Sequence, residues 1–233
     1  MKTLVLVAAE KREFAGLEPR LARRESLGWS LDYCCAAVLG GRRVLLVANG
    51  QGRRLAVEAL ELVRNRTEVG AVISTGFCGG LDPALAPAEI FVARQVRGPE
   101  TACYPAAHAE CARPHVQGVL LSQDRIVQTS RDKQRLWEQG CAAVDLESAA
   151  LAERASAWGL PFYAIRAVTD TAEESFGCDL EGARLGDGRL SYRKLLMAAL
   201  RHPPARLPEL WRLRRRAMRA ASALGQFLAD CRF

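Results

Sequence analysis

Short apolar runs alternate with mixed, amphipathic segments along most of the chain. Such runs predict buried strands, and we expect them at residues 1–9, 31–38, 43–48, 69–74, 89–96, 118–122 and 160–168. The segments between and after them predict helices at residues 10–21, 53–64, 130–139, from about 145, 191–200 and 208–228. Strands that alternate with helices predict a largely parallel sheet flanked by helices.

Glycine-rich breaks separate several of these elements. Residues 39–42 (Leu-Gly-Gly-Arg) predict a turn between two strands, and residues 49–52 (Asn-Gly-Gln-Gly) precede a helix. A glycine-containing turn is expected at 75–81, directly after a strand. We interpret the irregular stretch 97–115 as a loop that crosses the face of the domain where the active site is expected. No repeat or linker divides the chain, so we expect one domain, 1–233, with 190–233 as a C-terminal basic helical extension.

Composition limits the class of protein. With 233 residues, of which 49% are hydrophobic and 25% charged, the chain fits a soluble globular domain. No run approaches the roughly 20 apolar residues of a membrane span, and we expect a cytoplasmic protein. The eight cysteines are too sparse for a disulfide scaffold. Cys103, His108, Cys111 and His115 do not have the usual zinc-ligand spacing, so no metal is expected.

The net charge of +7 is concentrated near the C-terminus. Residues 201–219 carry many arginines, and the last predicted helix has a mostly apolar face opposite most of them. This helix either packs on the domain with a solvated basic face, or holds the protein at an anionic membrane surface. No nucleic-acid motif accompanies the charges, and we expect no nucleic-acid partner.

Acidic residues follow two neighbouring predicted elements. The apolar run that ends near residue 168 is followed by Asp170, and Asp145 and Glu147 stand where a helix begins. Two carboxyl groups in one crevice suit a reaction that needs a proton donor and a grip on hydroxyls. Without a family pattern, Asp170 is better explained as a helix N-cap or a strand-end salt-bridge partner than as a catalytic acid, and Asp145 is best explained by the helix dipole.

Four sequence blocks in order resemble the nucleoside phosphorylase and nucleosidase superfamily. They are Ala9–Phe14, Asn49–Gly52, Ser74–Leu81, and the pair Val144–Glu147 with Arg166–Asp170. The resemblance implies an α/β, three-layer phosphorylase-like fold, with a central, mostly parallel mixed sheet flanked by helices. It also implies that no cofactor is needed and that the protein is a homo-oligomer.

The C-terminal region is similar to the hopanoid-associated phosphorylase branch of that superfamily. The similarity lies in Gly186–Arg189, Arg201–Pro203 and Leu207–Leu210. That branch is implicated in the removal of adenine from adenosylhopane, a lipid-linked nucleoside. A lipid-linked substrate would give the basic helix a reason to contact the inner membrane surface.

The resemblance assigns catalytic roles to two carboxyl groups. Asp170 matches the acid that protonates N7 of the leaving purine, which requires a raised pKa in a partly desolvated pocket. Glu13 matches the carboxylate that activates the attacking water, although it lies one residue further from the first strand than in the family. Glu10 remains the competing choice.

Other positions match residues that bind the nucleoside. Glu147 matches the residue that accepts hydrogen bonds from the ribose hydroxyls, and Leu146 would lie against the sugar. Negative charge at Glu147 also favours an oxocarbenium-like sugar. The remaining substrate-binding candidates are Gly76, Phe77 and Thr169.

Departures from the family pattern bear on the choice between water and phosphate. Ser74 and Phe77 stand where hexameric phosphorylases carry an arginine and a serine that hold phosphate. Arg42 matches an arginine that such enzymes lend to the phosphate site of a neighbouring subunit. The loss of a bidentate grip and a hydroxyl favours hydrolysis.

The sequence therefore predicts an N-glycosidase that releases adenine from a 5′-modified adenosine, with adenosylhopane as the suggested substrate. Alternatives are a methylthioadenosine/S-adenosylhomocysteine nucleosidase, a phosphate-dependent purine nucleoside phosphorylase, and a nucleoside-binding protein without turnover. The presence of Glu13, Glu147 and Asp170 together favours an enzyme, because binding alone does not need all three.

Overall fold

The computed structural model describes residues 2–177, 181–183, 185 and 203–233. Its strands are β1 Thr3–Ala8, β2 Ala22–Ser26, β3 Tyr33–Leu39, β4 Arg42–Ala48, β5 Val69–Gly80, β6 Ile90–Arg97, β7 Cys103–Pro105, β8 Val116–Ser122, β9 Ala143–Asp145 and β10 Phe162–Asp170. Its α-helices are α1 Arg53–Arg64, α2 Ser130–Glu138, α3 Ser148–Ala157 and α5 Pro203–Asp230. Short 3-10 helices are η1 Lys11–Phe14, η2 Glu18–Arg20 and η3 Pro99–Thr101.

All ten strands of the described residues belong to one mixed sheet, in the order β10-β6-β8-β9-β5-β1-β4-β3-β2, with β7 paired to β6. The central strands β4, β1, β5 and β10 are parallel. Because β10 pairs with both β5 and β6, the strands β5, β9, β8, β6 and β10 close a ring. The carboxyl ends of the parallel strands meet at one edge, where α/β sheets usually bind ligands.

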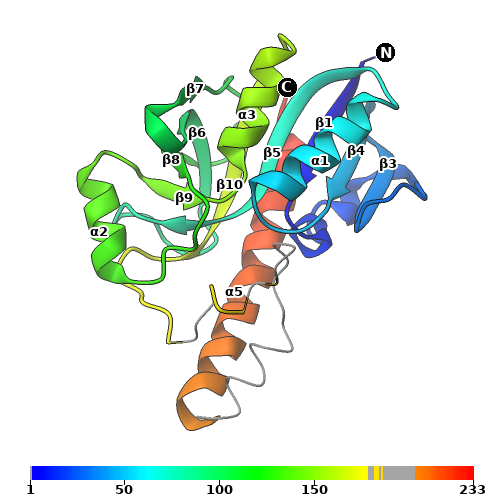
Figure 1. Ribbon diagram of the computed structural model, residues 1–233. Coiled ribbons are helices and arrows are strands. Elements are labelled where there is room, and N and C mark those ends of the chain that lie inside the picture. The colour runs from blue at the N-terminus through cyan, green and yellow to red at the C-terminus, as the bar shows by residue number, and fades with distance from the viewer. Residues whose placement is uncertain (1, 178–180, 184, 186–202) are drawn as a thin grey trace.

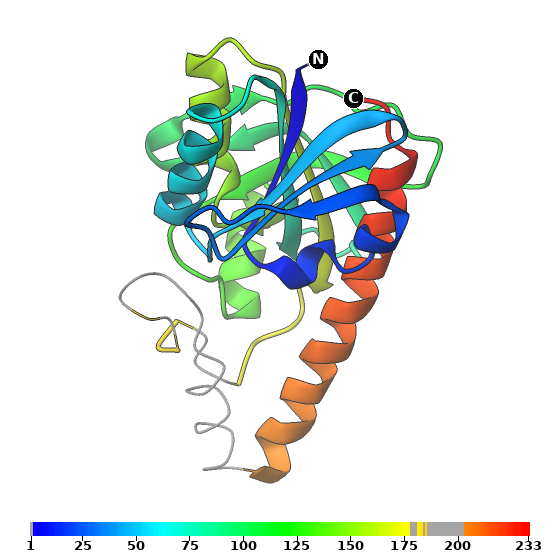
Figure 2. The same ribbon diagram turned by 90° about the vertical axis from the view of Figure 1, so that its right-hand side faces the viewer.

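Helices cover both faces of this sheet (Figure 1; Figure 2). Side chains of β1 alternate between the two faces, as the pleat requires. Val5 and Val7 pack in a cluster with residues of α1 and α3, whereas Leu4 and Leu6 pack in a second cluster with α5. The predicted three-layer α/β fold is therefore confirmed.

The long helix α5 docks on the sheet through its C-terminal half. There Gly225 lies directly against Gly16, and a Cβ atom at either glycine would overlap the backbone of the other segment. The N-terminal half of α5 extends beyond the body of the molecule (Figure 2). No helix of the described residues has the length and apolarity that crossing a bilayer requires.

Several elements of the structure differ from the prediction. Residues 10–21 do not form one helix but the two short helices η1 and η2, because Pro19 cannot donate a hydrogen bond to an earlier carbonyl. Strand β2 was not expected, since all five of its residues are exposed and show no apolar alternation. The last helix begins at Pro203 rather than 208; proline is tolerated in a first helical turn.

The glycine-containing segment 75–81 was predicted to be a turn, yet β5 continues through it to Gly80. Pairing with β10 and β9 keeps it extended, and the positive φ of 128° at Gly76 is the local bend. Asp145 likewise ends strand β9 instead of starting a helix. The predicted helix 191–200 and the motif at 186–189 lie outside the described residues.

Candidate active site

The candidate residues Glu13 and Asp170 lie against the second half of β5. Glu13, from η1, accepts hydrogen bonds at Oε2 from the backbone N–H groups of Ala9 (2.8 Å) and Glu10 (2.9 Å). Its Oε1 accepts from the N–H of Phe77 at 2.9 Å. A Cβ atom on Gly76 would lie 2.7 Å from Oε1, so only glycine leaves room for the carboxylate at this bend.

Burial distinguishes Glu13 from its competitor Glu10. Glu13 is buried, and this desolvation raises its pKa against the opposing effect of the backbone N–H donors and of Arg166. Glu10 is partly exposed and pairs with Arg12 at 2.8 Å. The structure thus places Glu13 inside the site and Glu10 at its rim.

Glu147 comes to the same region from the start of α3. Its Oε1 accepts a hydrogen bond of 2.7 Å from the N–H of Gly52, which precedes α1. Burial raises the pKa of Glu147 to about 7, with a further contribution from the neighbouring charge of Asp145. A group with this pKa changes its charge near neutral pH.

A buried arginine lies beneath these carboxylates. Arg166 Nε donates to Asp145 Oδ2 at 2.9 Å, and Nη2 donates to the hydroxyls of Ser74 (2.7 Å) and Ser148 (2.8 Å). Asp145 is therefore the partner of a buried ion pair, which corrects its interpretation as a residue that serves the helix dipole. The positive charge of Arg166 lowers the pKa of Glu13 and, with other groups, opposes the burial effect.

Asp170 ends β10 and lies against β5 on the other side. Its Oδ1 accepts a hydrogen bond from Thr169 Oγ1 at 2.8 Å, and its Oδ2 accepts one from Lys133 Nζ at 2.5 Å. A Cβ atom on Gly79 would lie 3.1 Å from Oδ2. Burial raises the pKa of Asp170, whereas Lys133 and Thr169 lower it.

The sequence pattern did not indicate Lys133 or the role of Arg166. Lys133 belongs to a helix rich in charged residues, whose polar composition suggested a solvent-facing surface. The available signal was its spacing, because Lys133 precedes Leu136 by three residues and so shares the inward face of α2. Arg166 interrupts an otherwise apolar strand, which is the usual mark of a buried, paired charge.

The remaining candidates are placed as follows. The Phe77 side chain is partly buried and packs against the core on the α5 side. Thr169 Oγ1 also lies 3.2 Å from the carbonyl oxygen of Cys78. Arg42 begins β4 at the opposite end of the parallel strands, where its guanidinium donates to the carbonyl of Phe233, so this chain does not bring it to the other residues.

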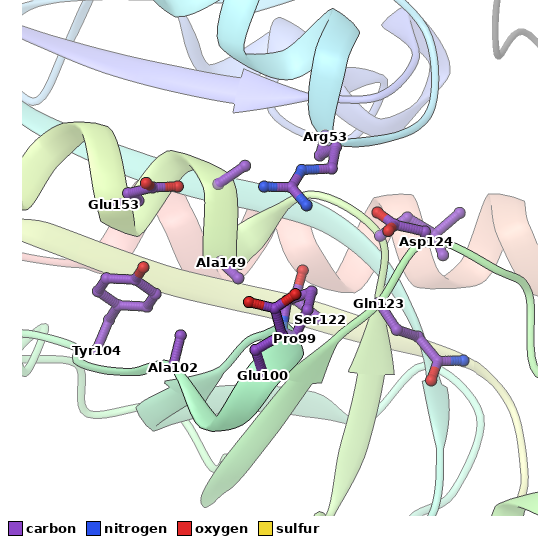
Figure 3. Close-up of a pocket in the computed structure, with 12 residues that line it drawn as sticks. Arg53, Pro99, Glu100, Ala102, Tyr104, Ser122, Gln123, Asp124, Ala149 and Glu153 are labelled. Carbon is purple, nitrogen blue, oxygen red and sulfur yellow. The ribbon is translucent and has the colours of Figure 1, made fainter.

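A cavity of about 430 Å³ adjoins the site (Figure 3). Among the predicted site residues only Leu146 lines it; Glu13, Glu147 and Asp170 do not. Arg53 and Glu100 point into it from opposite sides (Figure 3). Its other charged lining residues are Asp124 and Glu153.

The described residues contain no group of three or more His, Cys, Asp and Glu side chains placed to hold a metal ion. Cys103 contacts Gln95, and His115 contacts Gln117 at 2.9 Å, so these members of the segment 97–115 have separate neighbours.

Residues 31–200 match the family model described as Phosphorylase superfamily, and the chain belongs to that superfamily. The superfamily predicted from the sequence blocks is therefore confirmed. The chain is 27% identical over 198 residues to a 5′-methylthioadenosine/S-adenosylhomocysteine nucleosidase of Baumannia cicadellinicola subsp. Homalodisca coagulata, covering 72% of this chain and 86% of that protein.

Solved structures show the same fold. The methylthioadenosine/adenosylhomocysteine nucleosidase of Neisseria meningitidis, in complex with methylthio-immucillin-A, has a TM-score of 0.74 at 18% identity, covering 99% of this chain and 98% of that one. Futalosine hydrolase of Helicobacter pylori has a TM-score of 0.70 at 16% identity, covering 98% and 96% of the two chains.

Proposed function

We propose that the protein is an N-glycosidase that hydrolyses a 5′-modified adenosine and releases adenine. The observation that carries the proposal is the set of three buried carboxyl groups, Glu13, Glu147 and Asp170, each fixed by hydrogen bonds at one edge of the sheet. The names of the nucleosidase relatives and of the structural neighbours agree with this class of enzyme.

In the proposed reaction Asp170 gives its proton to N7 of the purine while the C1′–N9 bond breaks and its electron pair leaves with the base. The sugar passes through an oxocarbenium-like state, and the ionised Glu147 accepts hydrogen bonds from the ribose hydroxyls. Glu13 takes a proton from the water that attacks C1′. This division of roles gives each buried carboxyl group one task.

Water is favoured over phosphate as the nucleophile. The Arg166 guanidinium at the floor of the site is committed to Asp145 and to the hydroxyl of Ser74. Phe77 supplies an apolar side chain where a hydroxyl would help to hold an anion. Phosphorolysis would need Arg42 from a second copy, since within one chain Arg42 lies at the far end of β4.

We place the 5′ substituent in the cavity beside Leu146, and this placement favours a polar substituent. Its lining includes Arg53, Glu100, Asp124 and Glu153, which match an amino-acid group better than a hydrocarbon. Adenosylhopane would need an apolar channel, so within the proposed function adenosylhomocysteine is the favoured substrate. The adenosylhopane prediction rests on residues 186–189, 201–203 and 207–210, of which 186–189, 201 and 202 lie outside the described residues.

The test is the release of free adenine from methylthioadenosine, adenosylhomocysteine and a lipid-tailed adenosine, each with and without phosphate. We expect phosphate-independent release, fastest from adenosylhomocysteine. Strict dependence on phosphate would overturn hydrolysis, and preference for the lipid-tailed substrate would overturn the polar substituent. No release from any of them would favour the nucleoside-binding alternative.

We also propose that α5 rests on an anionic membrane surface. Trp211 (63% exposed) and Met218 (64% exposed) lie seven residues apart, and therefore on the same side of the helix. Arg214 and Arg215, between them along the chain, are exposed, and the guanidinium of Arg215 lies 5.0 Å from the Trp211 ring. Apolar residues flanked by arginines are complementary to acyl chains beneath anionic headgroups.

Sedimentation with phosphatidylglycerol/phosphatidylcholine vesicles tests this contact. Binding should decrease with salt, disappear with pure phosphatidylcholine, and weaken at least about tenfold in a Trp211→Ser/Met218→Ser variant. Absence of binding to anionic vesicles would contradict it. Salt-dependent binding to DNA but not to vesicles would assign this face to nucleic acid instead. An oligomer that the double substitution dissociates would assign it to a second copy of the chain.

A further inference from the structure

Lys133 carries a buried ammonium group. The roles proposed for Glu13, Glu147 and Asp170 do not explain why a lysine is buried there. Lys133 is the buried residue of α2, and its side chain is 0% exposed. Removing a lysine from water is costly unless it is well paired. At the exposed positions of α2 a lysine would remain hydrated. A lysine at the buried position 133 therefore suggests a functional role.

All contacts of Lys133 lead to the end of β10. Its Nζ donates to Asp170 Oδ2 at 2.5 Å and to the carbonyl oxygen of Thr171 at 2.7 Å, and it lies 5.2 Å from the centre of the Phe176 ring. The bond to a backbone carbonyl fixes the ammonium independently of the charge on Asp170. Lys133 is thus held in place before any change in Asp170 occurs.

These contacts make the two oxygens of Asp170 different. Oδ2 is occupied by the ammonium and lies against Gly79, so the acid form carries its proton on Oδ1. The Thr169 hydroxyl is 2.8 Å from Oδ1 and 3.2 Å from the carbonyl of Cys78. Because it has one proton to donate, it can turn to Cys78 when Oδ1 is protonated and to Oδ1 when it is not.

We propose that Lys133 is a positioning residue that orients Asp170 and stabilises the carboxylate formed as Asp170 gives its proton to the leaving base. The inference rests on the proposed function. The proton moves from Oδ1 to the purine nitrogen, the C1′–N9 electron pair leaves with the base, and the negative charge left on Asp170 meets a fixed ammonium. Charge that develops during the reaction is stabilised most by a group already in place.

Other charged groups around Asp170 are few among the described residues. Glu174 follows β10 and is paired with Arg216 of α5, which limits its repulsion of Asp170. The Cys78 thiol of β5 is buried, and its pKa is raised, so it stays neutral. Lys133 is therefore the cation that most directly sets the behaviour of Asp170.

Lys133→Met, which keeps an unbranched side chain one atom shorter but removes the charge, tests the proposal. Arg131→Met, an exposed cation on the same helix, is the control. We expect Lys133→Met to lower kcat for adenine release about 10²-fold with little change in KM. Asp170 acts when protonated, and loss of the cation raises its pKa, so the alkaline limb of the kcat profile should move to higher pH.

An unchanged kcat plateau, or an alkaline limb that stays in place, would overturn the role of Lys133. Lys133→Arg should restore part of the activity and Lys133→Gln, which can still donate to Thr171, should not. Carbon-13 NMR titration of the Asp170 carboxyl group in wild type and in both uncharged variants gives a readout without turnover. If the wild type released no adenine, the proposed function would fail. A higher pKa of Asp170 in the variants would even then support the electrostatic role of Lys133, whereas an unchanged pKa of Asp170 would contradict that role.

Discussion

At the scale of single residues, Glu13 is held by the backbone and not by a countercharge. Three N–H groups use both lone-pair sites of Oε2 and one site of Oε1. A carboxylate oxygen accepts two hydrogen bonds, so Oε1 keeps one free site for a water molecule. Its pKa is raised by burial, which makes the group a better base than an exposed glutamate.

Glu13→Gln should lower kcat by about 10²–10⁴-fold, because an amide cannot take the proton of the attacking water. Glu10→Gln, a neighbouring change at the rim, should stay within about threefold of wild type, as expected for a partly exposed carboxylate. Steady-state adenine release measures both. The opposite order of effects would assign the nucleophile's base to Glu10.

Glu147 should make nucleoside binding depend on pH. Burial raises its pKa to about 7, so the ionised form that accepts two ribose hydroxyls predominates only above that pH. The affinity for methylthioadenosine, measured by calorimetry on an inactive Asp170→Asn variant, should fall up to about tenfold per pH unit below the pKa and level off above it.

Glu147→Gln should bind more weakly and lose this pH dependence. An affinity of the Asp170→Asn protein with Glu147 intact that does not change between about pH 6 and pH 8 would contradict the assignment of Glu147 as the acceptor of the ribose hydroxyls.

The roles that the sequence did not indicate were missed for one physical reason. Arg166 lies 21 positions from its partner Asp145, and Lys133 lies 37 positions from its partner Asp170. Local patterns record exposure and periodicity, and they cannot report which distant charge a side chain meets. Glu13, Glu147 and Asp170 were indicated because each stands in a short block that resembles the superfamily.

Among the elements, α5 approaches the segment between η1 and η2 so closely that neither Gly225 nor Gly16 has room for a Cβ atom. Gly225→Ala should destabilise the protein by about 1–3 kcal/mol or more, because the added methyl group would overlap the backbone at Gly16. Gly28→Ala is the matched control, since a Cβ atom there has no neighbour within 4 Å.

Urea unfolding measures both glycine variants, and Gly28→Ala should stay within about 0.5 kcal/mol of wild type. Equal stability of the two variants would show that α5 is not docked on Gly16 as described.

Elements with a complete local pattern were predicted well. Helix α1 has the bounds expected from its amphipathic spacing, and the hairpin β3–β4 follows from its double-glycine turn. The predictions failed at residues 10–21 and 75–81. In the first, Pro19 prevents a continuous helix; in the second, strand pairing with β10 and β9 overrides the glycines.

At the scale of the whole molecule, the strand order explains how the site is assembled. Glu13 follows β1, Glu147 follows β9 and Asp170 ends β10, and all three strands pair with β5. The glycines at the end of β5 leave room for two of the three carboxyl groups. A site built in this way requires the folded sheet, which is why the sequence alone predicted its members but not their mutual contacts.

Adenine release by wild type and by Asp170→Asn, with adenosylhomocysteine and without phosphate, is the measurement that tests the proposed acid most directly. We expect turnover by wild type and a decrease of at least about 10²-fold in the variant, because asparagine keeps the shape but has no acidic proton. An Asp170→Asn protein that releases adenine within a few-fold of the wild-type rate would contradict the role of Asp170 as the acid.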